Sequence, residues 1–95
     1  MDSIEVVAHQ LIEHALAIHR NVINHEGMSA DMSILNVQAM LNLVVGLEPG
    51  DQQSAYWKVI DRLGVMPLNR DSQRTIFSII SDIIERIFPS AGLHF

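Results

Sequence analysis

Apolar residues recur at three- and four-residue spacing along most of the chain, and this period predicts amphipathic α-helices. The first predicted helix covers residues 3–25. Asp2 or Ser3 is expected to cap its start, and Gly27 is expected to end it. Its apolar stripe consists of Ile4, Val7, Ala8, Leu11, Ile12, Ala15, Ile18 and Val22.

The second predicted helix covers residues 31–47 and carries no charged residue after Asp31. Its apolar side chains cover about half of the helix circumference, so we expect it to be the most deeply buried helix. The run Glu48-Pro49-Gly50-Asp51 that follows is typical of a turn, and Asp51 is expected to cap the next helix. The apolar positions are Ile34, Val37, Met40, Leu41, Val44, Val45 and Leu47.

The third predicted helix covers residues 52–63 and is expected to end at Gly64, because glycine commonly terminates helices. The fourth covers residues 70–88, with a start near Asn69 or Asp71. The apolar face of the third helix holds Tyr56, Val59, Ile60 and Leu63, and the wide apolar arc of the fourth holds Ile76, Phe77, Ile79, Ile80, Ile83, Ile84, Ile87 and Phe88.

These elements predict an all-α fold, a compact four-helix bundle-like domain with short connections. Pro89 is expected to stop the last helix, and residues 89–95 form an irregular tail. The chain shows no internal repeat and no low-complexity linker, so residues 1–95 are expected to form a single helical domain.

Composition excludes several classes of protein. Hydrophobic residues make up 48% of the chain, which excludes intrinsic disorder. Six Lys and Arg residues against eleven Asp and Glu residues give a formal charge of −5, which argues against nucleic acid as a partner. The longest uncharged stretch, residues 32–47, is too short and too polar to span a membrane. We therefore expect a soluble, acidic, cytoplasmic protein with no membrane partner.

No motif assembles a catalytic site. The chain has no cysteine, no Gly-x-Ser-x-Gly nucleophile elbow and no glycine-rich phosphate loop, so we expect a protein that is not an enzyme and binds no cofactor. Four histidines, at positions 9, 14, 19 and 25, lie in the first helix at spacings of five or six residues. A spacing of five residues separates side chains by about 140° around a helix, so no metal ligands are assigned.

A column formed by Glu5, His9 and Glu13 has the four-residue spacing that could hold a divalent ion. The simpler interpretation is a solvated helix face with weak ion pairs. Because such a column could hold an ion and histidine titrates near neutral pH, a histidine-based metal or pH sensor is kept as a third hypothesis of function.

The favoured hypothesis is a small non-enzymatic protein–protein interaction module, a regulatory adaptor or antagonist that binds another protein through helical surface. The apolar arc of the fourth helix is wider than the ~100° that a one-sided surface helix needs, so we expect a homodimer formed chiefly through this helix. Trp57 is also expected to lie in an interface, because tryptophan is enriched at binding hot spots. The interface candidates are Phe77, Ile84, Phe88, Trp57, Leu93 and Phe95.

The alternative hypothesis is a DNA-associated transcriptional regulator. Residues 38–63 can be interpreted as a helix-turn-helix-like element, with polar residues near the start of the second helix. The basic residues Arg62, Arg70 and Arg74 would form the nucleic-acid patch. The acidic turn before the second helix argues against this hypothesis, because phosphates would lie there.

Overall fold

Four α-helices make up most of the chain. The computed structural model describes residues 3–24, 30–48 and 50–89, with side chains described for 3–20, 33–48 and 50–89. The helices are α1 (Ser3–Asn24), α2 (Ala30–Val45), α3 (Asp51–Val65) and α4 (Arg70–Ile87), and the described residues contain no strand. The predicted all-α, bundle-like fold is confirmed.

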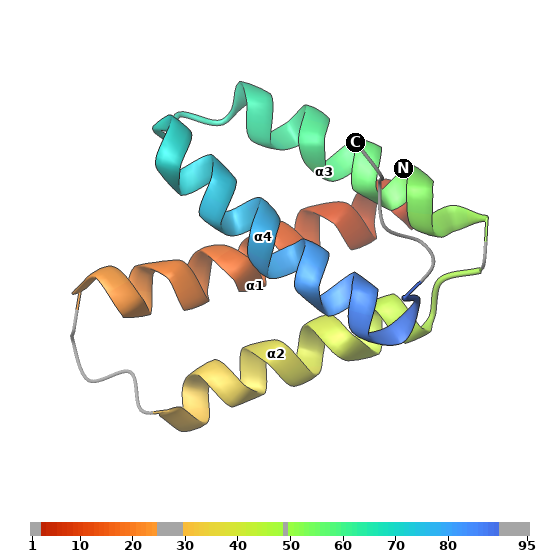
Figure 1. Ribbon diagram of the computed structural model, residues 1–95, viewed down its shortest axis with the longest axis horizontal. Coiled ribbons are helices and arrows are strands. Elements are labelled where there is room, and N and C mark those ends of the chain that lie inside the picture. The colour runs from red at the N-terminus through yellow and green to blue at the C-terminus, as the bar shows by residue number, and fades with distance from the viewer. Residues whose placement is uncertain (1–2, 25–29, 49, 90–95) are drawn as a thin grey trace.

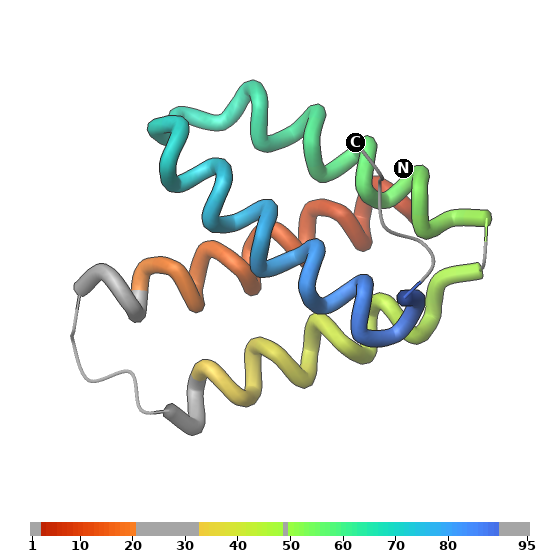
Figure 2. The backbone as a smooth tube through the Cα atoms, in the orientation of Figure 1, coloured from red at the N-terminus to blue at the C-terminus, as the bar shows by residue number. Residues whose placement is uncertain are grey.

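Helices α1 and α4 form the middle of the domain (Figure 1). Both pack against each of the other three helices, whereas α2 and α3 pack on α1 and α4 and hardly touch each other. The tube drawing in Figure 2 shows that successive helices run in alternating directions. The radius of gyration is 12.9 Å, close to the ~13 Å of a compact domain of this length.

None of the described helices is long and apolar enough to span a membrane.

The core lies between the two central helices and receives side chains from all four. Helix α2 contributes two fully buried residues to the core, and each of the others contributes three or four. The buried cluster consists of Ala8, Leu11, Ile12, Ala15, Met40, Val44, Tyr56, Val59, Leu63, Ile76, Ile80, Ile83 and Ile84.

The hydroxyl of Tyr56 is one of the polar groups that join α3 to α4. It lies 3.4 Å from the Ser81 carbonyl oxygen and 3.3 Å from the Ser81 Oγ. Burial raises the pKa of the Tyr56 hydroxyl, the Ser81 hydrogen bond lowers it, and the nearby charges of Glu85 and Asp82 raise it further. The tyrosine therefore stays neutral and brings a hydrogen bond into the core without a charge.

The prediction that α2 is the most deeply buried helix is wrong. Ile34, Leu35 and Val45 are each more than half exposed. The physical reason is position, since α2 lies at one side of the domain and packs against α1 and α4 only. Its uncharged sequence therefore covers an outer face as well as an inner one.

The predicted boundaries of α3 also need correction. The helix begins at Asp51 rather than after it, so Asp51 is not a cap, and Gly50 stands at the cap position without a side-chain hydrogen bond. At the other end the helix continues through Gly64. Pro67 ends it, because a proline holds the residue before it in an extended conformation, and Met66 has φ −79° and ψ 147°.

The start of α4 follows its sequence signal. Asn69 is extended, and its side chain accepts a hydrogen bond of 2.8 Å from the backbone N–H of Ser72. Replacing Asn69 by Ala removes this cap and is expected to lower the free energy of unfolding by about 0.5–2 kcal/mol. Urea unfolding followed by circular dichroism measures the loss. Asn69→Asp keeps an acceptor at the same place and should retain most of the stability, so equal losses in both variants would contradict the capping role.

Candidate functional site

One face of α2 presents large apolar side chains to solvent. It consists of Ile34, Leu35, Gln38, Asn42 and Val45, and we call it the α2 outer face. All five residues are exposed, and at 100° per residue they fall within about 100° of the helix surface. The apolar members are 53%, 59% and 64% exposed.

The α2 outer face is also free of charge. No Asp, Glu, Lys or Arg occurs between Ser33 and Leu47, whereas the exposed sides of the other helices carry charged residues such as Arg62 and Glu85. An apolar, uncharged surface on a small domain usually marks an interaction site. The same absence of charge in the sequence predicts a buried helix, whereas in the structure it belongs to an exposed helix face.

The predicted interface residues on α4 have different outcomes. Ile84 is fully buried within the chain, so its assignment to an exposed edge is wrong. The reason is that three helices surround α4 and cover both edges of its apolar arc. Phe77 and Phe88 are half-buried and pack against the core, with the Phe77 ring 6.0 Å from that of Tyr56.

The remaining interface candidates lie elsewhere. Trp57 is 52% exposed, as expected for a residue off the core-facing side of α3. It lies on a helix that hardly touches α2, so it does not extend the α2 outer face. Leu93 and Phe95 lie outside the described residues.

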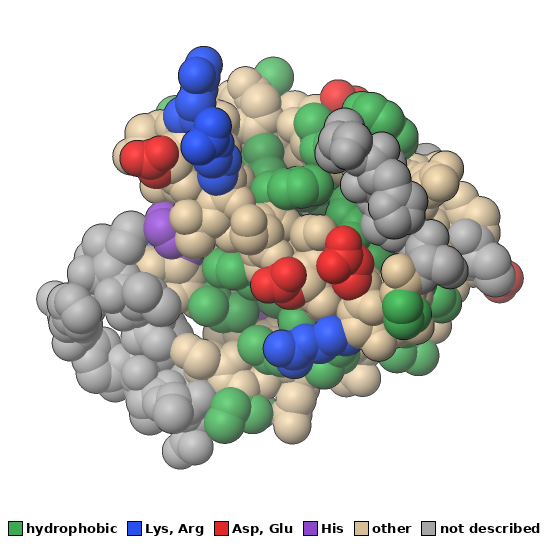
Figure 3. Space-filling view, in the orientation of Figure 1, with side chains coloured by type: hydrophobic (Ala, Val, Ile, Leu, Met, Phe, Trp, Pro, Cys, Tyr) green, Lys and Arg blue, Asp and Glu red, His purple; other side chains and the backbone are tan. Residues whose placement is uncertain are grey.

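The arginines predicted as a nucleic-acid patch do not form one group. Arg62 lines a groove between α3 and α1, whereas Arg70 and Arg74 line a second groove between α3 and α4. In Figure 3, basic side chains gather over the start of α4, with acidic side chains beside them and over the second half of that helix. The described surface in this view therefore lacks a continuous basic stripe for a phosphate backbone.

The predicted helix-turn-helix geometry is wrong for residues 38–63. Such a motif needs its two helices to pack together so that the first supports the second in the groove of DNA. Helices α2 and α3 instead lie on opposite sides of the central pair (Figure 1).

The histidines of α1 each have a polar partner on another helix. His14 Nδ1 lies 2.8 Å from Asn36 Oδ1 and joins α1 to α2. His19 Nε2 lies 3.2 Å from Ser72 Oγ and joins α1 to α4. His25 lies outside the described residues.

The predicted column of Glu5, His9 and Glu13 on α1 does not form one site, because Glu5 has a different partner from His9 and Glu13. Glu5 Oε1 accepts a hydrogen bond of 3.0 Å from Lys58 Nζ, whereas His9 Nε2 lies 3.2 Å from Glu13 Oε1. Arg62 Nη2 lies 3.2 Å from His9 Nδ1. Within the described residues no three His, Asp or Glu side chains are grouped to hold a metal ion. The column therefore contributes one ion pair and one hydrogen bond between α1 and α3, and one contact within α1. Sequence spacing did not show that Arg62 takes part.

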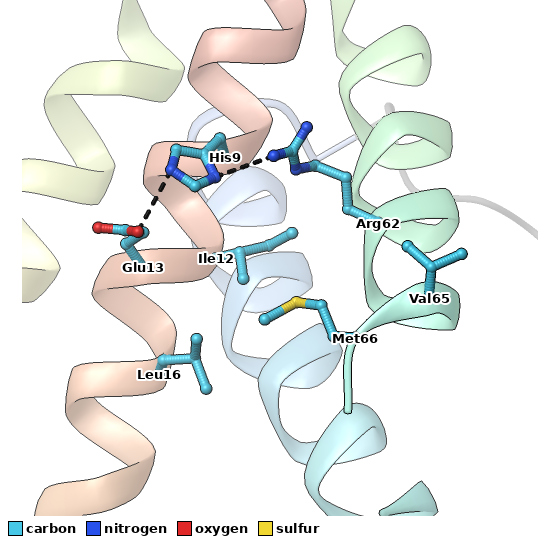
Figure 4. Close-up of a pocket in the computed structure, with 7 residues that line it drawn as sticks. All are labelled: His9, Ile12, Glu13, Leu16, Arg62, Val65 and Met66. Carbon is cyan, nitrogen blue, oxygen red and sulfur yellow. Dashed lines mark hydrogen bonds and ion pairs between the residues drawn. The ribbon is translucent and has the colours of Figure 1, made fainter. Parts of the chain in front are cut away.

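The groove between α1 and α3 has a volume of about 310 Å³, within the range of small-molecule sites. Figure 4 shows its polar residues at one end and its apolar residues below them. Arg62 comes from the last turn of α3, and Met66 follows the end of that helix. The lining residues are His9, Ile12, Glu13, Leu16, Arg62, Val65 and Met66.

Comparison of the chain with protein-family models, with curated proteins and with solved structures finds no significant match in any of the three. The function is therefore argued from the geometry of the described residues.

Proposed function

We propose that the protein is a non-enzymatic protein–protein interaction module whose first partner is a second copy of itself, bound through the α2 outer face. The observation that carries the proposal is the exposed, uncharged surface of this helix. Covering it removes large aliphatic side chains from water, which is the main favourable term in protein association.

The order of residues on the α2 outer face supports a second copy as the partner. Leu35, Gln38, Asn42 and Val45 are spaced by three, four and three residues. The series is therefore symmetric about position 40, with an aliphatic residue at each end and an amide on each side of the centre. Two antiparallel α2 helices related by a two-fold axis would place aliphatic against aliphatic and amide against amide.

The chemistry of these side chains suits self-association. Gln38 and Asn42 each carry donors and acceptors, so an amide can pair with another amide. Charged side chains would meet like charges in many such symmetric contacts, and the chain carries a formal charge of −5. A face without charge allows two acidic domains to meet without placing like charges in contact. In the same register Ile34 would face Gly46, where no side chain limits the approach.

Sedimentation equilibrium tests the proposal. We expect the wild-type protein to have twice the 10.6 kDa mass of one chain in the micromolar range. Val45→Glu introduces two buried carboxylates into the dimer, so its dissociation constant is expected to rise about a hundredfold. Val65→Glu is a matched control, because both valines are exposed and each is the last residue of its helix. A monomeric wild type, or equal effects of the two variants, would contradict the proposal.

Mixing two single variants tests the antiparallel register. Gln38→Glu and Asn42→Lys each place like charges near the two-fold axis and should weaken their own homodimers. In an equimolar mixture the carboxylate at 38 of one chain meets the ammonium at 42 of the other. The heterodimer is therefore expected to form more tightly than either homodimer. A mixture that associates no better than its components would exclude this register.

A further inference from the structure

The groove between α1 and α3 separates polar from apolar groups along its length. His9, Glu13 and Arg62 lie at one end, and Leu16 and Met66 lie toward the other (Figure 4). Ile12 lies between the two ends in the same view. A ligand that fits this groove needs one polar end and one apolar end.

The polar end is fixed by two hydrogen bonds that determine the state of His9. Because a guanidinium has donors only, Nδ1 of His9 accepts from Arg62 at 3.2 Å. The ring therefore carries its proton on Nε2 and donates it to Glu13 at 3.2 Å. Glu13 is thus held on the side of His9 away from Arg62, as Figure 4 shows.

Arg62 supplies the charge that selects the ligand. The bond to His9 uses one of the five N–H groups of the guanidinium. The others suit an anion with two oxygens in one plane, and a carboxylate has this geometry. The side chain is exposed at the mouth of the groove, so an anion can reach it from solvent.

The apolar end suits a flexible hydrocarbon chain. Val65 is 85% exposed, which makes it the most exposed large hydrophobic residue among those described. Met66 is half-buried beside it, and its unbranched thioether adapts to irregular shapes. A ligand chain lying against Leu16, Val65 and Met66 would remove this surface from water, whereas Ile12 beside them is already buried.

We infer that the groove binds a medium-chain monocarboxylate, with its carboxylate on Arg62 and its hydrocarbon chain against Leu16, Val65 and Met66. The second groove, between α3 and α4, has a similar volume of about 290 Å³ but is more open to solvent. It also contains arginines, and it therefore provides an internal comparison.

Decanoate is the probe, titrated below the concentration at which it forms micelles and followed by amide chemical shifts in NMR. We expect saturable shifts at His9, Leu16 and Met66, and the affinity should rise about threefold to fourfold for each methylene from hexanoate to decanoate. Decylamine has the same chain with the opposite charge and is expected to bind at least about tenfold more weakly. Equal affinity for decylamine, or shifts centred on the α2 outer face, would overturn the inference.

Variants of the arginines locate the site. Arg62→Gln removes the charge from an exposed position and is expected to weaken decanoate binding about tenfold. Arg62→Lys keeps the charge but loses the planar pair of N–H donors, so its affinity should lie between those of the wild type and Arg62→Gln. Arg74→Gln is the matched control, because it removes the same charge from the second groove. Binding that is unchanged in Arg62→Gln, or weakened equally in Arg74→Gln, would show that this groove is not the site. Sedimentation of the same samples reports self-association separately.

Discussion

Replacing Ile80 by Ala is expected to lower the free energy of unfolding by about 2–5 kcal/mol, because the change leaves a cavity in the core. Ile80 is fully buried and lies in the middle of α4, one of the two helices that pack against all three others. For a domain of this size each kcal/mol lowers the melting temperature by about 4–8 °C. Thermal and urea unfolding followed by circular dichroism measure both quantities.

Ile34→Ala is the matched control for this prediction. It makes the same chemical change at a side chain that is 53% exposed, and is expected to change the stability by at most about 0.5 kcal/mol. Both variants should be measured at a protein concentration at which sedimentation shows a monomer, since a dimer adds stability that depends on concentration. Equal losses at the two positions would show that the face of α4 is wrongly placed.

Local signals predicted the helices well. The apolar period, the Asn69 cap and the proline at position 89 placed α4 within one residue of its observed ends. Such signals act between neighbours in sequence, so one chain is enough to interpret them. The end of α3 shows their limit, because Gly64 and Pro67 both signal a stop and only the proline prevents the helix from continuing.

The position of each helix in the bundle was not predictable in the same way. The width of an apolar arc shows how much surface a helix can bury but not which neighbours cover it. The arc of α4 is covered by three helices, whereas part of the apolar surface of α2 is left exposed. Lack of charge in α2 therefore indicated an uncharged outer face as much as a buried one.

The candidate groove depends on contacts that sequence spacing does not contain. Arg62 and His9 are 53 residues apart, and proximity in sequence grouped Arg62 with Arg70 and Arg74 instead. Arg62 lies on α3 and lines the groove toward α1, whereas Arg70 and Arg74 lie on α4 and line the groove between α3 and α4. The prediction of ion pairs along α1 was closer to the structure, but it named only partners on the same helix.

Ile84→Glu is expected to prevent the domain from folding at every protein concentration. Ile84 is fully buried, and burying an unpaired carboxylate costs several kcal/mol, a large share of the roughly 5–15 kcal/mol that stabilises a typical domain. Circular dichroism should show the loss of helix and of a cooperative thermal transition. Phe77→Glu serves as the comparison, because Phe77 is half-buried and a carboxylate there can reach water. This variant should remain folded with a lower melting temperature.

The pair of variants also decides which helix forms the interface. If α4 joined two chains, Ile84→Glu would give a folded monomer, because the carboxylate would be exposed once the partner had left. With Ile84 inside the chain, dissociation cannot expose it, and only unfolding brings the charge into water. A folded, monomeric Ile84→Glu protein would therefore contradict the burial of this residue and return the interface to α4. An unfolded Ile84→Glu chain together with a folded, monomeric Val45→Glu chain would assign packing to α4 and association to α2.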